Sequence, residues 1–293
     1  MLLAIDVGNT QTVVGLFDVG AHARGRPATA ASALDAMPAG LVDSWRVTTV
    51  AERTAEEHLL ELAQLLELSG VHLRGPGDVR RADIDGVVVS SSVPRVGATL
   101  AEMAERFLAV PLVVVGPGIR TGMPIRYENP REVGADRVTN AVAALDLTRP
   151  PLVVVDLGTA TTFDVISSSG EYLGGAIAPG LDISMDALYA HAAALPRVAL
   201  GEPRRVIGRT TVESMQAGAV YGHAALVDGM CARLEEELGP LTVLATGGLA
   251  ALVAPHARRV TRLEPWLTLH GLRLLYTMNA PHDGAGERRG DDW

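Results

Sequence analysis

The stretch LLAIDVGNTQTVVGLF, residues Leu2–Phe17, says more about the fold than any other part of this 293-residue sequence. Two apolar runs flank a short polar segment, residues 8–11, and this pattern is typical of a β-hairpin. Asp6 ends the first apolar run, where a carboxylate costs free energy unless a counter-charge or hydrogen bonds compensate it. The hairpin is therefore either a simple capped turn or a binding site for a charged ligand.

The polar turn has the features that a phosphate group requires. Gly8 lets a ligand approach the backbone closely, and successive backbone N–H groups can point at an anion. Asn9, Thr10 and Thr12 add side-chain donors. An aspartate beside a bound phosphate normally needs Mg²⁺ between them, directly or through water. If the turn binds phosphate, we expect Asp6 to lie near Mg²⁺.

The same pattern recurs in the second half of the chain. Residues Leu152–Ile166, LVVVDLGTATTFDVI, again combine an apolar strand, an Asp-x-Gly segment, a threonine-rich turn and a second apolar strand. Two such hairpins about half a chain apart indicate a duplicated domain, with both hairpins facing one cleft. A constant offset of 150 positions aligns Asp6 with Asp156, Gly8 with Gly158, Asn9 with Thr159 and Thr12 with Thr162.

The charge balance restricts the function. The net charge is −9 without any long basic run, which argues against nucleic-acid binding. All 25 basic residues are arginine, so a Walker A P-loop, a protein-kinase strand lysine and a Schiff-base lysine are excluded. Any phosphate must therefore be bound by backbone amides, threonine, arginine and a metal ion.

Hydropathy and cysteine content indicate a globular protein. Hydrophobic residues make up 48% of the chain, yet no apolar run approaches the ~20 residues of a membrane span. The N-terminus lacks the basic segment of a secretory signal. Cys231 is the single cysteine and stands in an apolar helical pattern, so we expect a buried structural thiol. We expect a cytoplasmic protein without a membrane or nucleic-acid partner.

Periodicity predicts a βββαβαβα order in the first half. After the hairpin, the Ala-, Gly- and Pro-rich segment Val19–Val42 is expected to form a long loop. The motif Thr54-Ala-Glu-Glu57 is a capping box that opens a helix. The other predicted elements are strands at Trp45–Val50, Gly86–Ser90 and Leu112–Val115, and helices from Pro94 and over Val133–Leu147.

The second half begins in the same way, which predicts two α/β domains at residues 1–148 and 149–280. Residues 281–293 are polar and Gly-rich and are expected to be disordered. Five-stranded units with helical crossovers imply mixed sheets that helices cover on both faces. The predicted elements are strands at Leu152–Asp156, Thr161–Ile166, Glu171–Ala178 and Thr242–Ala245, and helices at Leu181–Ala193, Thr211–Leu238 and Leu267–Asn279.

Four further motifs can carry chemistry. In Gly134-Ala-Asp-Arg137, Asp136 is either a partner of the helix dipole or a base that faces the cleft, beside an arginine suited to a carboxylate or phosphate. The Gly-rich segment Gly174–Gly180 permits close approach of a ligand or of a second backbone. Thr210 or Thr211 is an N-cap candidate, and Thr246-Gly-Gly248 follows a strand, where nucleotides often bind.

Together, these motifs resemble those of the type III pantothenate kinases over about residues 1–279. The resemblance rests on DVGNT, YENPREVGADR, VVDLGTATTFDVI, YLGGAIAPGLDISMDAL, IGRTTVESMQAG and ATGG. It implies an α/β fold of two duplicated actin-like (ribonuclease H-like) βββαβαβα domains around a nucleotide cleft. It also implies transfer of the ATP γ-phosphate to the primary hydroxyl of pantothenate, which gives 4′-phosphopantothenate in the first step of coenzyme A biosynthesis.

The resemblance assigns roles to individual residues. It implies Asp136 as general base, Asp156 as the ligand of a monovalent cation (K⁺ or NH₄⁺), and Asp6 near Mg²⁺. It also implies a homodimer whose partner subunit helps to close the pantothenate pocket. The implied ATP-binding residues are Asp6, Val7, Gly8, Asn9, Thr10, Gln11, Thr12, Val13, Thr159, Gly247 and Gly248. The implied pantothenate-binding residues are Tyr127, Gly134, Ala135, Asp136, Arg137 and Thr211.

Two departures and two alternatives accompany the resemblance. The segment Val19–Val42 is longer than the usual hairpin tip, and Thr210 stands where the family has asparagine before its pantothenate threonine. One alternative is another small-molecule kinase or a polyphosphate phosphatase of the same superfamily. The other is a regulatory relative without turnover, against which the retention of the candidate site residues argues. Fold by itself does not settle function.

Overall fold

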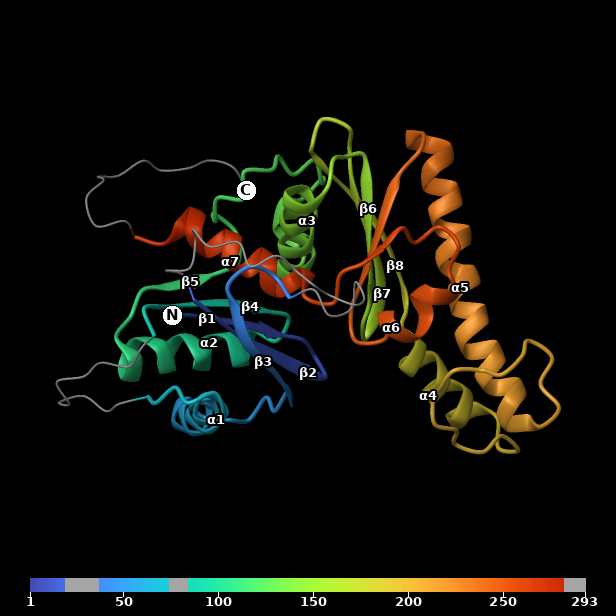
Figure 1. The fold of residues 1–293 in the computed structure, drawn as a ribbon, viewed down its shortest axis with the longest axis horizontal. Coiled ribbons are helices and arrows are strands. Elements are labelled where there is room, and N and C mark those ends of the chain that lie inside the picture. Colours follow the sequence, from blue (N-terminus) through green and yellow to red (C-terminus); the bar gives the residue numbers. More distant parts are fainter. Residues whose placement is uncertain (19–36, 74–83, 282–293) are drawn as a thin grey trace. The chain divides into compact units, whose positions relative to one another are not determined.

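The computed structural model describes residues 1–18, 37–73 and 84–281 (Figure 1). This part of the chain divides into two compact units. The first contains residues 1–18, 37–73, 84–143 and 268–281, and the second contains residues 144–267. The predicted domain limits at residues 148 and 280 stay predictions. Residues 282–293, most of the predicted disordered tail, lie outside the described residues.

The first unit contains a mixed β-sheet. The structure describes five strands in it, in the order β3-β2-β1-β4-β5. The three strands β1, β2 and β3 are antiparallel neighbours, whereas β1, β4 and β5 are parallel. The carboxyl ends of β1 and β4 therefore lie at the same edge. The strands are β1 (Leu2–Val7), β2 (Gln11–Phe17), β3 (Leu41–Thr48), β4 (Gly86–Ser91) and β5 (Leu112–Val114).

Two helices, α1 (Ala55–Leu68) and α2 (Pro94–Met103), cover one face of this sheet (Figure 1). Alternate strand residues, among them Leu3, Ile5 and Val7, pack with residues of both helices in one buried cluster. The predicted capping box is present, since Thr54 accepts from the Glu57 N–H and the Glu57 side chain accepts from the Thr54 N–H. The remaining elements are a π-helix (Ala104–Leu108), a 3₁₀ turn (Pro130–Glu132), α3 (Ala135–Leu147), which continues into the second unit, and α7 (Leu267–Asn279).

The second unit repeats the strand order. Its described strands also number five, in the order β10-β9-β6-β7-β8, so β6 corresponds to β1, β7 to β2 and β9 to β4. The long helix α5 (Thr211–Leu238) contacts α4 (Leu181–His191), which lies beside the first turns of α5 (Figure 1). The other elements are β6 (Leu152–Leu157), β7 (Ala160–Ile166), β8 (Tyr172–Pro179), β9 (Thr242–Thr246), β10 (Arg262–Leu263), α6 (Ala250–Val253) and a 3₁₀ turn (Ala254–His256).

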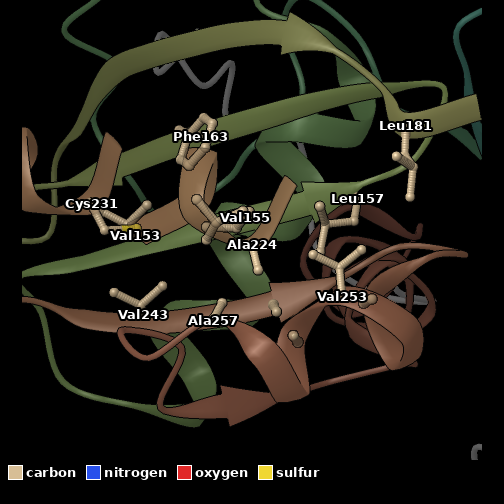
Figure 2. Close-up of a cluster of buried hydrophobic side chains, with 14 of the residues drawn as sticks. Val153, Val155, Leu157, Phe163, Leu181, Ala224, Cys231, Val243, Val253 and Ala257 are labelled. Carbon is tan, nitrogen blue, oxygen red and sulfur yellow. The ribbon is translucent and has the colours of Figure 1, made fainter. Parts of the chain in front are cut away.

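The core of the second unit lies between one face of its sheet and helix α5. Val153, Val155 and Phe163 point into this layer and meet Ala224 and Cys231 of α5 (Figure 2). Burial raises the pKa of the Cys231 thiol to about 11, so the thiolate is scarce at neutral pH. The expectation of a buried structural thiol is confirmed.

The predicted fold class, two duplicated actin-like α/β domains with mixed sheets, is confirmed, and two details differ. Strand β3 begins at Leu41, not at Trp45, because Leu41 pairs with Phe17, and the polar residues of this half-exposed strand hide the pattern. Strand β10 is missing from the prediction because two residues carry no periodicity. Residues 19–36 of the predicted loop lie outside the described residues. Within the described parts of the chain, no helix has the length and apolar character to cross a membrane.

Candidate active site

The first hairpin turn is fixed by Thr49, the residue that follows β3. The Thr49 hydroxyl donates to the Gly8 carbonyl (2.8 Å), and the Thr49 N–H donates to the Thr10 carbonyl (3.0 Å). The Thr12 hydroxyl lies 2.9 Å from the Thr49 hydroxyl. Because the Thr49 proton goes to Gly8, Thr12 is the donor of this bond. One threonine therefore binds the turn through three hydrogen bonds.

These bonds determine where the turn's amides point. In a trans peptide the N–H is opposite to the C=O. The peptides whose carbonyls face Thr49 therefore direct the N–H groups of Asn9 and Gln11 away from it. Asn9, Thr10 and Gln11 are exposed, whereas the Gly8 N–H donates to the Gln11 carbonyl (3.0 Å). The turn thus has outward backbone donors of the kind that bind anions.

Asp136 is linked to this hairpin within the first unit. Its Oδ2 atom lies 3.4 Å from the Ser92 hydroxyl, and its Oδ1 atom accepts from the Arg137 N–H (2.9 Å). The Ser92 N–H in turn donates to the carbonyl of Val7, the last residue of β1 (2.8 Å). A single residue thus connects the half-buried Asp136 carboxylate to the strand that leads into the turn. Asp136 also lies in the first turn of α3, so both interpretations of this residue agree with its position.

Arg137 and Tyr127 lie on either side of the 3₁₀ turn that precedes α3. Arg137 is buried, with 8% of its surface exposed, and Tyr127 is half-buried. The loop before Tyr127 is fastened to the end of α7, because the Asn279 side chain accepts from the Arg120 N–H and donates to the Arg120 carbonyl (2.8 Å each). Two hydrogen bonds of the Arg120 backbone thus hold the residues before Tyr127 to the end of α7.

The second hairpin has a tighter turn than the offset of 150 suggests. Val7 pairs with Thr12, but Leu157 pairs with Thr161, so three residues form the second turn and four form the first. The counterpart of Thr12 is therefore Thr161, and the predicted alignment of Thr12 with Thr162 is wrong. The sequence offset holds only up to the turn, because the second turn is one residue shorter.

Gly180 supports this second turn without any side chain. It lies between β8 and α4, in the position that Thr49 has after β3, because Gln11 pairs with Thr48 and Ala160 pairs with Pro179. A Cβ at Gly180 would overlap the carbonyl oxygens of Thr159 and Gly158. Of the two interpretations of Gly174–Gly180, the contact at Gly180 is therefore a close approach between two backbones.

Asp156 lies against Gly247 at the carboxyl ends of β6 and β9. Asp156 pairs with Thr246, and a Cβ on Gly247 would overlap the Asp156 Oδ1 atom. Gly247 also has a φ of +99°, which favours glycine. Glycine at this position therefore lets the backbone pack directly against the Asp156 carboxylate. Among the residues that the structure describes, no group of three or more His, Cys, Asp or Glu side chains is arranged to hold a metal ion.

Thr210, not Thr211, caps helix α5, because its side chain accepts from the Glu213 N–H (3.2 Å). This leaves Thr211, the first helical residue, available to a ligand. Thr211 lines a cavity of about 950 Å³ between α4 and α5, together with Ser214, Met215 and His223. The sequence left Thr210 and Thr211 as N-cap candidates, and the cap is Thr210.

Three residues that support the candidate site were not identified from the sequence. Thr49 and Ser92 contact partners 41 and 44 positions away, and His223 contacts Thr161 across 62 positions. Such pairs leave no local pattern. Ser92 had the best signal, because it follows a buried strand in the serine run Ser90–Ser92, at an edge where parallel strands place ligands.

Two five-stranded mixed sheets of equal strand order, each with an Asp-x-Gly hairpin, define the actin-like ATPase and sugar-kinase class. Known structures agree with this fold. An ethanolamine utilization protein, EutJ, from Carboxydothermus hydrogenoformans is similar with a TM-score of 0.50 and 12% identity, over 93% of this chain and 89% of that chain. A protein from Campylobacter jejuni described as a Baf family transcriptional activator has a TM-score of 0.52 and 16% identity, over 94% and 97%.

Sequence comparison identifies the family. The family model described as type III pantothenate kinase matches residues 2–233. The type III pantothenate kinase of Myxococcus xanthus is 48% identical over 280 residues, which cover 95% of this chain and 99% of that protein. The enzyme of the same name from Streptomyces avermitilis is 49% identical over 287 residues, or 95% and 98%. The chain belongs to the type III pantothenate kinase family.

Proposed function

We propose that this chain transfers the γ-phosphate of ATP to the primary hydroxyl of pantothenate, with Asp136 as general base. Family membership makes it an ATP-dependent kinase of coenzyme A biosynthesis, with Mg²⁺-ATP and pantothenate as substrates. The observation that carries the residue assignment is the path from Asp136 through Ser92 to Val7, which joins a carboxylate to the base of a phosphate-type hairpin. A hydroxyl that attacks phosphorus must lose its proton, and a carboxylate in this position can accept it.

ATP binding is assigned to the first hairpin and to glycines of the second unit. Residues Asp6–Val13 would bind the phosphates, with support from the outward N–H groups of Asn9 and Gln11 and from the three hydrogen bonds of Thr49. Phosphoryl transfer depends mainly on alignment and on neutralising the phosphate charge, so amides and Mg²⁺ suffice without a lysine. Thr159, Gly247 and Gly248 would complete the nucleotide site, and Asp6 would lie near Mg²⁺.

Pantothenate binding is assigned to the start of α3, to Tyr127 and to Thr211. Arg137 suits the pantothenate carboxylate, because a guanidinium can donate two parallel hydrogen bonds to it. Its burial supports this role, since a buried arginine is already held in one orientation and loses little freedom on binding. Gly134 and Ala135 would contribute backbone contacts around it.

Asp156 is our candidate ligand for a monovalent cation. Its half-buried carboxylate lies at the carboxyl ends of β6 and β9, and its oxygen atoms are suitable ligands for a K⁺ or NH₄⁺ ion, which would add positive charge near the nucleotide. We expect turnover to be about tenfold lower when Na⁺ replaces K⁺, as followed by ADP release at constant ionic strength. Equal rates in the two salts would contradict the role given to Asp156.

We also propose that the enzyme is a cytoplasmic homodimer. Large apolar side chains are exposed on the second unit, among them Ile177 (66%), Val206 (70%) and Ile207 (80%), and such residues often mark protein–protein contacts. The partner subunit would then cover the cavity that contains Thr211. Light scattering should give twice the chain mass of 30.7 kDa, and a monomer at micromolar concentration would contradict the dimer.

The experiment that tests the proposed reaction is ADP release by the purified protein with and without pantothenate. We expect release to depend on pantothenate and mass spectrometry to find one added phosphate. A pantothenate analogue in which hydrogen replaces the primary hydroxyl serves as the matched control and should leave only background release. Release that does not depend on the acceptor would contradict the proposal.

A further inference from the structure

Helix α5 is joined to the second hairpin by a buried hydrogen bond between two side chains. The His223 Nε2 atom lies 2.7 Å from the Thr161 hydroxyl. Thr161 is fully buried, and His223 has 7% of its surface exposed. Removal of one partner of such a buried hydrogen bond costs free energy, because the remaining polar group stays buried and has no hydrogen-bond partner.

Thr161 stands at a critical position of the hairpin. It pairs with Leu157, so these two residues close the three-residue turn Gly158–Ala160. Successive strand residues point to opposite faces of a sheet. Thr161 therefore faces α5 with Phe163, whereas Thr162, which pairs with Asp156, faces the other side. His223 thus fixes the strand at the last residue before the turn.

The residues that follow β3 and β8 support the two turns differently. In the second hairpin this residue is Gly180, which packs against the turn carbonyls but has no side chain that can bond to them. In the first hairpin, by contrast, the equivalent Thr12 hydroxyl bonds to Thr49, which also bonds to the turn's carbonyls. His223 occupies the place of Thr49 as the hydrogen-bond partner of the threonine after the turn, but it comes from a helix.

We propose that His223 is a positioning residue, which holds Thr161 and through it the turn of the second hairpin in the conformation that binds nucleotide and cation. The inference rests on the proposed function of Thr159 and Asp156. Burial lowers the pKa of His223, so the neutral imidazole, which can donate or accept, is its form at neutral pH. His223 also lines the cavity that contains Thr211, twelve residues earlier on the same helix.

A purely structural histidine would give a different result from a positioning residue. If the bond only stabilises the unit, its removal lowers the melting temperature and leaves the kinetic constants of the folded enzyme unchanged. If it positions the turn, its removal weakens ATP and cation binding in the folded enzyme. The two roles are therefore separated by ligand binding measured on folded protein.

The test uses His223→Leu, Thr161→Val and the double variant in the full-length enzyme. We expect each single variant to weaken binding of a fluorescent ATP analogue roughly 3- to 10-fold, as the loss of one buried hydrogen bond predicts. The K⁺ concentration for half-maximal activity should rise in parallel. The double variant should be no worse than either single variant, because both remove the same bond.

Two further variants complete the design. His223→Gln retains a hydrogen-bonding group and should restore at least part of the ATP affinity, and it also replaces His223→Leu if that protein does not fold. Val227→Ala, one turn further along α5 and fully buried, is the matched control that should lower the melting temperature without changing ATP binding. If His223→Leu and Thr161→Val behave like Val227→Ala, the inference is wrong. Nucleotide binding needs no turnover, so the outcome stays distinct from a failure of the proposed reaction in the wild-type enzyme.

Discussion

The two hairpins share a strand order but are supported in opposite ways. The first has a four-residue turn that Thr49 binds through side-chain and backbone donors, with Asn9, Thr10 and Gln11 exposed. The second has a three-residue turn that packs directly on the backbone of Gly180 and is tied to α5 through buried Thr161. Three residues of the first turn are thus exposed, whereas in the second turn Thr159 is exposed and the residues on either side of it are half-buried.

This difference shows how a duplicated element can specialise. Loss of one residue from the turn moves the following strand by one position, so the hydroxyl of Thr161 replaces that of Thr12 in the sheet. The first turn then suits the phosphates, which need several amides, and the shorter second turn, which exposes Thr159, suits a single contact.

The largest effect should come from Asp136→Asn, because the proposed base is linked through Ser92 to the first hairpin, and the second hairpin has no such role in the proposal. Asparagine keeps the shape and one oxygen but cannot accept the proton of the attacking hydroxyl. General-base catalysis contributes ~10²–10⁴ in rate, so turnover should fall by about that factor while ATP still binds. Steady-state turnover and melting temperature are measured on one preparation. A helix-dipole role predicts instead a loss of only ~0.3–1 kcal/mol in stability with nearly full turnover.

Arg137→Ala should have the next largest effect, and it should fall on the acceptor alone. Charged hydrogen bonds contribute about 1.5–3 kcal/mol each, so the pantothenate KM should rise roughly 10- to 100-fold while the ATP KM changes little. Arg137→Lys is the matched variant, since it keeps the charge and loses the paired donors. A collapse of ATP affinity in Arg137→Ala would place this arginine on the nucleotide and would remove the separation between the two ligands.

A pair of substitutions tests the supports themselves. Gly180→Ala adds a Cβ where the carbonyls of the second turn lie, and overpacking of this kind costs ~1–3 kcal/mol, so the melting temperature should fall. Thr49→Val keeps the shape but removes the hydroxyl, and we expect the ATP KM to rise a few-fold with a small change in stability. Thermal unfolding and ATP kinetics are measured for both variants. Equal changes of stability and KM in the two would show that the turns are supported alike.

The duplicated hairpins and the capping box could be predicted from the sequence. An aspartate inside an apolar run is costly and therefore conspicuous, so Asp6 and Asp156 reveal the duplication. The capping box of Thr54 and Glu57 is local and could be predicted for the same reason. These features depend on neighbouring residues, and a pattern can detect them.

The remaining features depend on pairing between distant segments. The shorter second turn becomes apparent only from the register that joins Leu157 to Thr161. The contacts of Thr49 and Ser92 link strands that no periodicity connects, and the two residues of β10 form a strand only beside β9. Candidate site residues can thus be proposed from the sequence where their chemistry is unusual for their position, whereas the residues that support them cannot.

The weakest effect concerns pH and involves His58 of the first unit and His223 of the second, which are both buried. Burial lowers the pKa of both His58 in α1 and His223 in α5, and the charge of Arg53 lowers that of His58 further. Both side chains are therefore neutral in the folded enzyme at a pH where the unfolded chain, with a pKa near 6.5, already binds protons. Their contribution to stability is complete above pH 6.5 and is lost as the pH falls below it, by at most about 1.4 kcal/mol per histidine and pH unit.

Urea unfolding between pH 5 and 7.5 measures how the free energy of unfolding changes with pH, and His58→Leu should reduce this slope relative to wild type. His223→Leu should reduce the slope as well and should also weaken ATP binding, whereas His58→Leu should leave ATP binding unchanged. A slope that neither substitution alters would show that other groups cause the loss of stability in acid.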